Sequence, residues 1–174
     1  MQKKYSNFYK INNLNTTAMN YQLDEIDKKI LDFLVENTRM PFTEIAKQMD
    51  VSAGTIHVRV KKMEDAGIIL GSSLNIDYGK LDYHFTAFIG ILLTKSNRTQ
   101  EVLKELASIP NVVEASVISG KYNIFCKVRA KHTEDAKRII YQIDDIQDVM
   151  RTESMISMEE YLSDRNRLIN AISI

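Results

Sequence analysis

The sequence has no tryptophan, two prolines and one cysteine among its 174 residues, and its positive and negative charges cancel. A lone cysteine, Cys126, excludes an internal disulfide and a zinc knuckle, and we interpret it as a buried thiol in a reducing compartment. The longest apolar run, 87–93, is far shorter than the roughly 20 residues that a membrane-spanning helix needs. With no secretory apolar core at the N-terminus, we expect a cytoplasmic protein without a membrane partner.

The net charge of zero argues against a nucleic-acid partner, because DNA-binding surfaces are usually basic. The distribution of charge is more informative than its sum. Residues 51–63 hold Arg59, Lys61 and Lys62 and no acidic side chain. Positive charge is therefore concentrated on one short element.

Two helices are predicted between residues 24 and 49. Apolar side chains recur at spacings of three and four in the first, which should end near Asn37, with Asp24 as N-cap and Asp27 in its first turn. Pro41 marks a break, and a short second helix follows with Thr43 near its cap.

A third helix should begin after Ser52, its expected N-cap, and end at Gly67, where glycine allows the left-handed backbone of a helix terminus. Its apolar stripe is narrow: Ile56, Val60 and Met63. Three helices with a tight turn between the second and third predict a helix-turn-helix.

Beyond Gly67 the pattern changes. Residues 68–76 predict a strand, and 77–82 predict a hinge. The rest alternates strand, helix, strand, strand, helix, strand, with the last strand over 149–158, which is the order of the ferredoxin-like split βαβ. The predicted class is α+β, organised as a disordered extension (1–20, with Met19 as a candidate translation start), a helix-turn-helix domain (21–70), a linking strand and hinge (71–82), a ferredoxin-like domain (83–162) and a tail with helical potential (163–174).

The strand over 83–93 carries apolar side chains on both faces. One face supplies the core, and Phe88 and Leu92 lie on the other. Helices that cover one face of an antiparallel sheet leave the second face to solvent. Isolated exposed apolar residues are common, but we expect a second subunit to cover this face in a homodimer.

If the stripe of the third helix packs inward, the helix turns Gly54, His57, Val58 and Lys61 outward. That face fits a major groove, where His57 can bond a base edge and Val58 can contact a thymine methyl. The helix N-terminus suits phosphate oxygens. We predict DNA contacts from Ser52, Gly54, Thr55, His57, Val58, Arg59, Lys61 and Lys62, although a basic helix surface can also be simply solvated.

Three stretches together resemble the Lrp/AsnC family of feast/famine regulators, over residues 23 to about 162. They are LDEIDKKILDFLVENTR (23–39), FTEIAKQMDVSAGTIHVRVKKMEDAGII (42–69) and GKYN (120–123). Ser52 matches the capping serine of that family, and Arg59 matches its recognition-helix arginine. The resemblance implies a transcriptional regulator that binds double-stranded DNA and forms homodimers, which assemble further to tetramers or octamers.

The resemblance also implies a small-molecule effector, an amino acid, bound between C-terminal domains. The matching positions are Gly120, Tyr122, Asn123, Thr152 and Ser154. The family usually has Asp where this chain has Asn123, and a neutral amide offers an ammonium group only a hydrogen bond, about half as strong as a charge-assisted one. The sequence GKYN also fits a simple hairpin turn.

No catalytic residue, metal site or cofactor is predicted, because His57, His84 and His132 lack metal-ligand spacing and no nucleotide-binding or nucleophile motif occurs. We expect a regulator and not an enzyme. Two other interpretations of the function stay open. One is a sirohaem-decarboxylase-like enzyme on the same fold, with His84 as its candidate histidine, and the other is an amino-acid-sensing module that does not bind DNA.

Overall fold

The computed structural model describes residues 21–164, 166 and 168–172. The extension predicted over 1–20, including Met19, lies outside the described residues. The chain divides into two compact units. The first contains the described residues up to Leu74 and those from Ser163 onward, and the second is Asn75–Leu162. The described part of the predicted tail, 163–174, therefore groups with the first unit.

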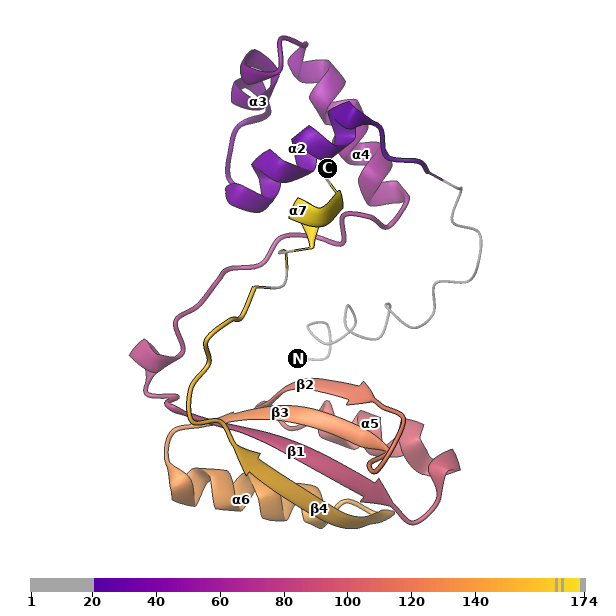
Figure 1. Cartoon of the computed structure of the whole chain (residues 1–174), viewed down its shortest axis with the longest axis vertical. Helices are drawn as coiled ribbons and strands as arrows, with labels where there is room; N and C mark the ends of the chain where they lie inside the picture. The colour runs from indigo at the N-terminus through magenta and orange to yellow at the C-terminus, as the bar shows by residue number, and fades with distance from the viewer. Residues whose placement is uncertain (1–20, 165, 167, 173–174) are drawn as a thin grey trace. The chain divides into compact units, whose positions relative to one another are not determined.

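The core of the first unit comes from three helices: α2 (Glu25–Glu36), α3 (Phe42–Gln48) and α4 (Ala53–Asp65), seen in Figure 1. Asp24 caps α2 in a capping box with Asp27, as expected. The second helix, α3, begins after Pro41, which is its N-cap residue, and no side chain caps it; Thr43, expected near the cap, lies in the first turn.

The turn between α3 and α4 is short and fixed by the backbone. Asp50 has a positive φ of 53°, and the Val51 N–H donates to the Ala46 carbonyl over 3.0 Å. Ser52 then caps α4, and Gly67, with φ of 72°, ends its C-terminal turn. Both expectations are confirmed, and the unit is a helix-turn-helix. Its core contains Ile30, Leu31, Ile45, Ala46, Ile56, Val60 and Met63.

The second unit is a four-stranded antiparallel sheet with two helices. Its elements are β1 (Phe85–Leu93), α5 (Thr99–Leu106), β2 (Val112–Val117), β3 (Ile124–Ala130), α6 (Thr133–Asp144) and β4 (Val149–Ile156). The strand order β2-β3-β1-β4 confirms the ferredoxin-like prediction. Side chains of both helices share one core with the inward face of β1 and β3. The last strand ends at Ile156, two residues earlier than predicted.

The other face of this sheet is only partly covered within the unit. Phe88 stacks on Phe125, with ring centroids 5.9 Å apart, and the Lys127 ammonium lies 5.7 Å from the Phe88 ring centroid. Phe88 and Leu92 are half-buried, and Met155 is exposed. We call this surface the open sheet face.

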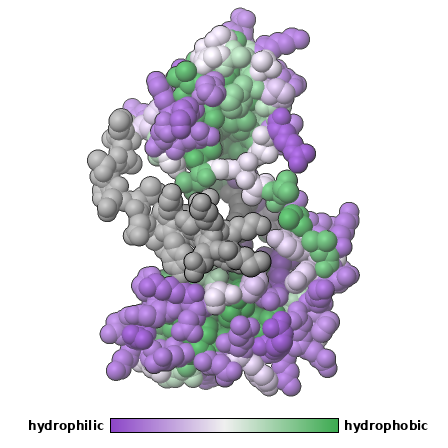
Figure 2. Space-filling model, turned by 180° about the vertical axis from the view of Figure 1, so that it is seen from behind, coloured by the Kyte–Doolittle hydropathy of each residue, from purple (hydrophilic) through white to green (hydrophobic). Residues whose placement is uncertain are grey.

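The prediction of a linking strand over 68–76 is wrong, because the segment is not a strand. Among the described residues no strand pairs with the segment, and a strand needs a hydrogen-bonding neighbour. Leu70 and Leu74 are 69% and 71% exposed, and Figure 2 shows apolar surface along this connecting segment. Two short 3₁₀ turns, η2 (Gly79–Leu81) and η3 (Ser96–Arg98), flank β1.

The tail contains one short helix, α7 (Ile169–Ile172), and Ile169 packs against the core of the helix-turn-helix unit. No helix in the described part of the chain is long and apolar enough to cross a membrane.

Candidate nucleic-acid interface

The outward face of α4 carries the residues predicted to contact DNA. Ile56, Val60 and Met63 are buried, which turns the opposite side of the helix to solvent. Gly54, Val58 and Lys61 lie on that side and are exposed; we call them the crest of α4. Val58 is 53% exposed at the middle of the helix. The structure therefore places an apolar side chain at the centre of a polar surface.

The first turn of α4 is held by its own hydroxyl groups. The Thr55 N–H donates to Ser52 Oγ over 3.0 Å, and the two hydroxyl oxygens lie 2.8 Å apart. One hydroxyl donates to the other, so one of the two O–H groups is left to donate to a ligand. Together with the remaining N–H groups of the turn, they form the part of the helix best suited to an anion.

The cations of α4 differ in their partners. The Lys61 ammonium pairs with Asp65, 2.8 Å away and one turn on, and both side chains are well exposed. This ion pair raises the pKa of Lys61. Within α4, Lys62 has no ion pair with any described residue. Lys62 is thus the cation of the helix whose charge is least compensated.

His57 lies on the side of α4 that meets α3. Its ring centroid is 6.1 Å from that of Phe42, and the two rings are tilted by 52°. One face of the imidazole is therefore occupied by a contact between helices. His57 is nevertheless exposed, and its contact with a base edge stays a prediction.

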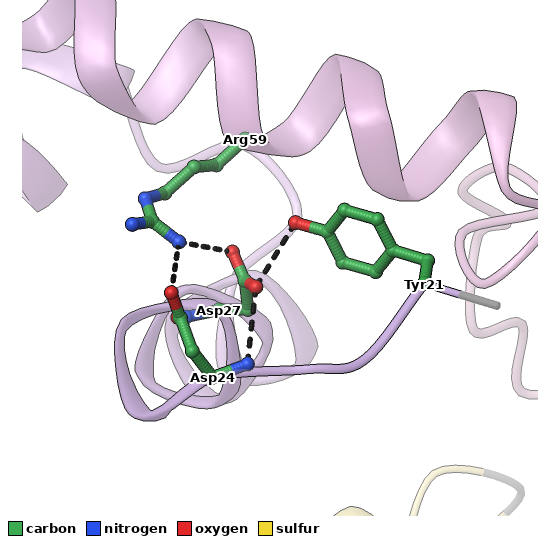
Figure 3. Close-up of polar contacts among 4 residues, drawn as sticks. All are labelled: Tyr21, Asp24, Asp27 and Arg59. Atoms are coloured by element: carbon green, nitrogen blue, oxygen red, sulfur yellow. Dashed lines mark hydrogen bonds and ion pairs between the residues drawn. The ribbon is translucent and has the colours of Figure 1, made fainter. Parts of the chain in front are cut away.

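Arg59 is engaged in a network that ties α4 to the start of α2 (Figure 3). Its Nη1 donates to Asp24 Oδ2 over 2.7 Å and to Asp27 Oδ1 over 2.9 Å. Asp27 is 1% exposed, and its second oxygen accepts from the Tyr21 hydroxyl and from the Asp24 N–H. We call Tyr21, Asp24, Asp27 and Arg59 the acid–arginine network.

The network changes the pKa of three of its members. The hydrogen bond from the Asp27 N–H, followed by that from Arg59, lowers the pKa of Asp24. Hydrogen bonds to the two carboxylates raise the pKa of Arg59, and burial together with the bond to Asp27 raises the pKa of Tyr21. The shifts of Asp24 and Arg59 favour the ionised carboxylate and the charged guanidinium, and the shift of Tyr21 favours its neutral hydroxyl.

Sequence reasoning treated Arg59 as a DNA ligand and missed its acidic partners. A signal was present, because Asp27 lies three and four positions before Ile30 and Leu31 and so falls on the buried side of α2. A carboxylate at such a position needs a cation. The partner could not be identified from spacing, since Arg59 lies 32 residues further along the chain.

An open groove of about 620 Å³ runs beside α4 and the start of α2. Residues of the first turn, of the flank of α4 and of the acid–arginine network line it together. They are Tyr21, Gln22, Asp24, Asp27, Ser52, Gly54, Thr55, Val58, Arg59 and Lys62. The groove thus brings six of the predicted DNA-contact residues together with two carboxylates, so side chains of both charges line it.

The predicted effector residues do not form one cluster. Thr152 and Ser154 pair with Ile91 and Ile89 on β1, so they lie on the same face of the sheet as the helices, and Thr152 donates to Asp144 of α6 over 2.7 Å. Gly120, with φ of 114°, belongs to the turn between β2 and β3. Tyr122 covers Gly90 on the open sheet face.

Three side chains of the GKYN loop already have partners within the unit. The Asn123 carboxamide oxygen accepts from the Leu93 N–H over 2.9 Å, and its nitrogen lies 3.3 Å from Ser96 Oγ. The Tyr122 hydroxyl donates to Glu153 over 2.5 Å, and the Lys121 ammonium pairs with the same carboxylate. Asn123 therefore braces the end of β1.

No group of three potential metal ligands occurs among the described residues. His132 caps α6, accepting from the Asp135 N–H, and His84 lies beside Gly79 of η2. Cys126 is buried in the sheet, and burial raises its pKa to about 12. The thiol is thus protonated and shielded, as the sequence indicated.

A helix-turn-helix with an exposed, partly basic last helix, joined to a ferredoxin-like domain, defines a DNA-binding transcriptional regulator. Two family profiles match: the AsnC-type helix-turn-helix domain over residues 23–64 and the Lrp/AsnC ligand binding domain over 86–167. The regulatory protein AsnC of Haemophilus influenzae is 41% identical over 140 residues, covering 80% of this chain and 93% of that protein.

Solved structures of other regulators have the same fold. The structure of Escherichia coli AsnC has 36% identity and a TM-score of 0.78, over 82% of this chain and 97% of that one. A Neisseria meningitidis transcriptional regulator solved as an L-Met complex shares the fold, with 19% identity and a TM-score of 0.80 over 87% and 99% of the two chains. The chain belongs to the Lrp/AsnC family.

Proposed function

We propose that this regulator reads double-stranded DNA with the crest of α4 set in the major groove. The observation that carries the proposal is the exposure of Val58 between Gly54 and Lys61. Within its own unit Val58 joins no core, and a valine methyl group is a fitting partner for the C5-methyl of thymine. Gly54 leaves space at the crest for close approach.

Different residues of α4 would contact the DNA bases and the DNA backbone. His57 and Val58 are the proposed base readers, and Ser52, Thr55 and Lys62 line or border the groove where a phosphate would lie. Lys61 shares its charge with Asp65. We therefore expect Lys62 to contribute more to backbone affinity than Lys61 does.

The test measures binding to the DNA upstream of the protein's own gene and to DNA selected in vitro, by fluorescence anisotropy across a range of salt concentrations. Lys62→Ala should weaken binding on every sequence and reduce the salt slope by about one. Val58→Ala should instead relax the preference at one base pair in each half-site. Lys104→Ala removes an exposed cation of α5 and serves as the matched control.

Two results would contradict this placement. The first is unchanged binding in Val58→Ala and Lys62→Ala. The second is that the wild-type protein fails to retard any of these DNAs at low salt, which would favour a sensing module that does not bind DNA.

We further propose that the second unit binds an amino acid and that this binding modulates DNA affinity. The match to the Lrp/AsnC ligand binding domain and the L-Met complex of the Neisseria regulator support it. A panel of amino acids should contain at least one that raises the unfolding temperature, since a ligand at 100 times its Kd stabilises by about 2.7 kcal/mol. A flat response to all twenty would count against an amino-acid effector.

Assembly beyond the single chain is the third part of the proposal. Phe88, Leu92 and Met155 of the open sheet face would be covered in a homodimer, which could pair further to tetramers or octamers. Two symmetric readers need half-sites about 34 Å apart or a multiple of that. Light scattering that finds a monomer at micromolar concentration would refute this part.

We place this DNA-binding regulator in the cytoplasm.

A further inference from the structure

The hydrogen bonds of Arg59 use one side of its guanidinium. Nη1 makes both bonds to the carboxylates, and the other terminal nitrogen points away from them in Figure 3. A guanidinium has five N–H donors in a rigid fork. Among the described residues, none accepts from Nε or Nη2. The Arg59 side chain is 24% exposed, and it lines the open groove beside α4.

The second edge belongs to the groove that also contains Ser52, Thr55 and Lys62. Hydroxyl groups, an ammonium group and a guanidinium edge are the donors that proteins use for phosphate oxygens. Arg59 can therefore bond a carboxylate with one edge and a phosphate with the other. A lysine at this position would present its three donors from one compact point and would lack the rigid fork that separates the two partners.

We propose that Asp24 and Asp27 are positioning residues for DNA binding, which hold Arg59 so that its second edge meets a backbone phosphate beside α4. This inference rests on the proposed DNA-binding function. It assigns a binding role to two acidic residues, one of them buried, that lie on a different helix from the reader.

The proposal opposes the simple electrostatic expectation. Asp24 and Asp27 together carry more charge than Arg59, so Coulomb's law alone predicts that removing either carboxylate tightens DNA binding. Preorganisation acts in the other direction. A free arginine side chain loses much of its rotamer freedom when it binds, and the two carboxylates impose that loss in the free protein.

The experiment uses the full chain and a DNA fragment that the wild type binds. Asp24→Asn and Asp27→Asn should each weaken binding by about 5- to 30-fold, which corresponds to the rotamer freedom of one arginine. Asp24 is half exposed, so its variant provides the test if the buried Asp27→Asn fails to fold. Circular dichroism establishes the folded state of each variant.

Glu25→Gln is the matched control. It removes the same charge from the same turn of α2, and its carboxylate bonds Lys28 and not Arg59. Its binding should be unchanged or tighter. Arg59→Lys keeps a charge beside the carboxylates and should also weaken binding.

A double-mutant cycle separates positioning from general damage to the domain. In the Arg59→Ala background, Asp24→Asn should no longer weaken binding and should tighten it, because only the charge effect remains. If Asp24→Asn weakens binding equally in both backgrounds, the acids act through the fold alone and the inference fails. It also fails if the wild type binds and Asp24→Asn tightens binding. A wild type that binds no DNA instead refutes the proposed function.

Discussion

Gly54 provides a test in which stability and DNA binding should move in opposite directions. A Cβ built on Gly54 would meet only Ser52 Oγ, at 3.7 Å, which is ordinary contact. Its backbone is helical, so Gly54→Ala should stabilise the protein by about 0.4–1 kcal/mol, mainly by restricting the unfolded chain. For a domain of this size that is a rise of roughly 2–8 °C in the unfolding midpoint.

The same methyl group would lie on the crest of α4, where the proposed DNA contact needs space. Overpacking at a close contact costs about 1–3 kcal/mol. The Kd for operator DNA should therefore rise by about 5- to 150-fold, as measured by fluorescence anisotropy. Calorimetry on the same preparation gives the stability.

Gly67→Ala is the control, because it should show the reverse behaviour. Gly67 has φ of 72°, and a Cβ there would meet nothing within 4 Å. The left-handed backbone costs an alanine about 1–2 kcal/mol, so stability should fall while DNA affinity is retained in the folded protein. If Gly54→Ala stabilises the protein and leaves DNA affinity unchanged, the crest of α4 is not the contact surface and the reasoning is wrong.

Three further predictions concern the rest of the structure. In Gly90→Ala the new Cβ would lie 2.7 Å from three ring carbons of Tyr122, so urea unfolding should show a loss of about 1–3 kcal/mol, largely recovered by adding Tyr122→Ala. Because the pKa of Asp24 is lowered from 3.8 in the folded protein, its carboxylate adds stability above pH 3.8, and this stability is lost as pH falls through the folded pKa. In a plot of unfolding temperature against pH, Asp24→Asn should therefore flatten the fall at acid pH. An unchanged fall would exclude this contribution. The pKa of Cys126, raised to about 12, predicts that thiol labelling near neutral pH is slow and accelerates with denaturant; rapid labelling of the native protein would show that the thiol is accessible.

Local signals in the sequence predicted what local physics decides. Asp24 and Ser52 cap their helices because a short side-chain oxygen reaches an N–H two or three residues on, and Gly67 ends α4 because it tolerates positive φ. The recurrence of apolar residues at every second position likewise predicted the four strands of the sheet.

The errors came from features that depend on a partner elsewhere. Residues 68–76 have the alternation of a strand, but a strand forms only where another strand offers hydrogen bonds. Tertiary contacts decided the candidate sites as well. The Arg59 partners are 32 and 35 residues away, and Asn123 is held by the end of β1, 30 residues earlier. The spacing of residues along the chain does not show which residues meet across separations of about this length.

Asp27 completes the first turn of α2 and also bonds a side chain of α4. The start of one helix and the docking of another therefore depend on the same buried carboxylate. If either the first turn of α2 or the docking of α4 were lost alone, the buried Asp27 carboxylate would lose partners, which is costly in a protein interior. The first turn of a helix usually frays, but here its amide protons should exchange only when the whole domain unfolds, as one cooperative unit.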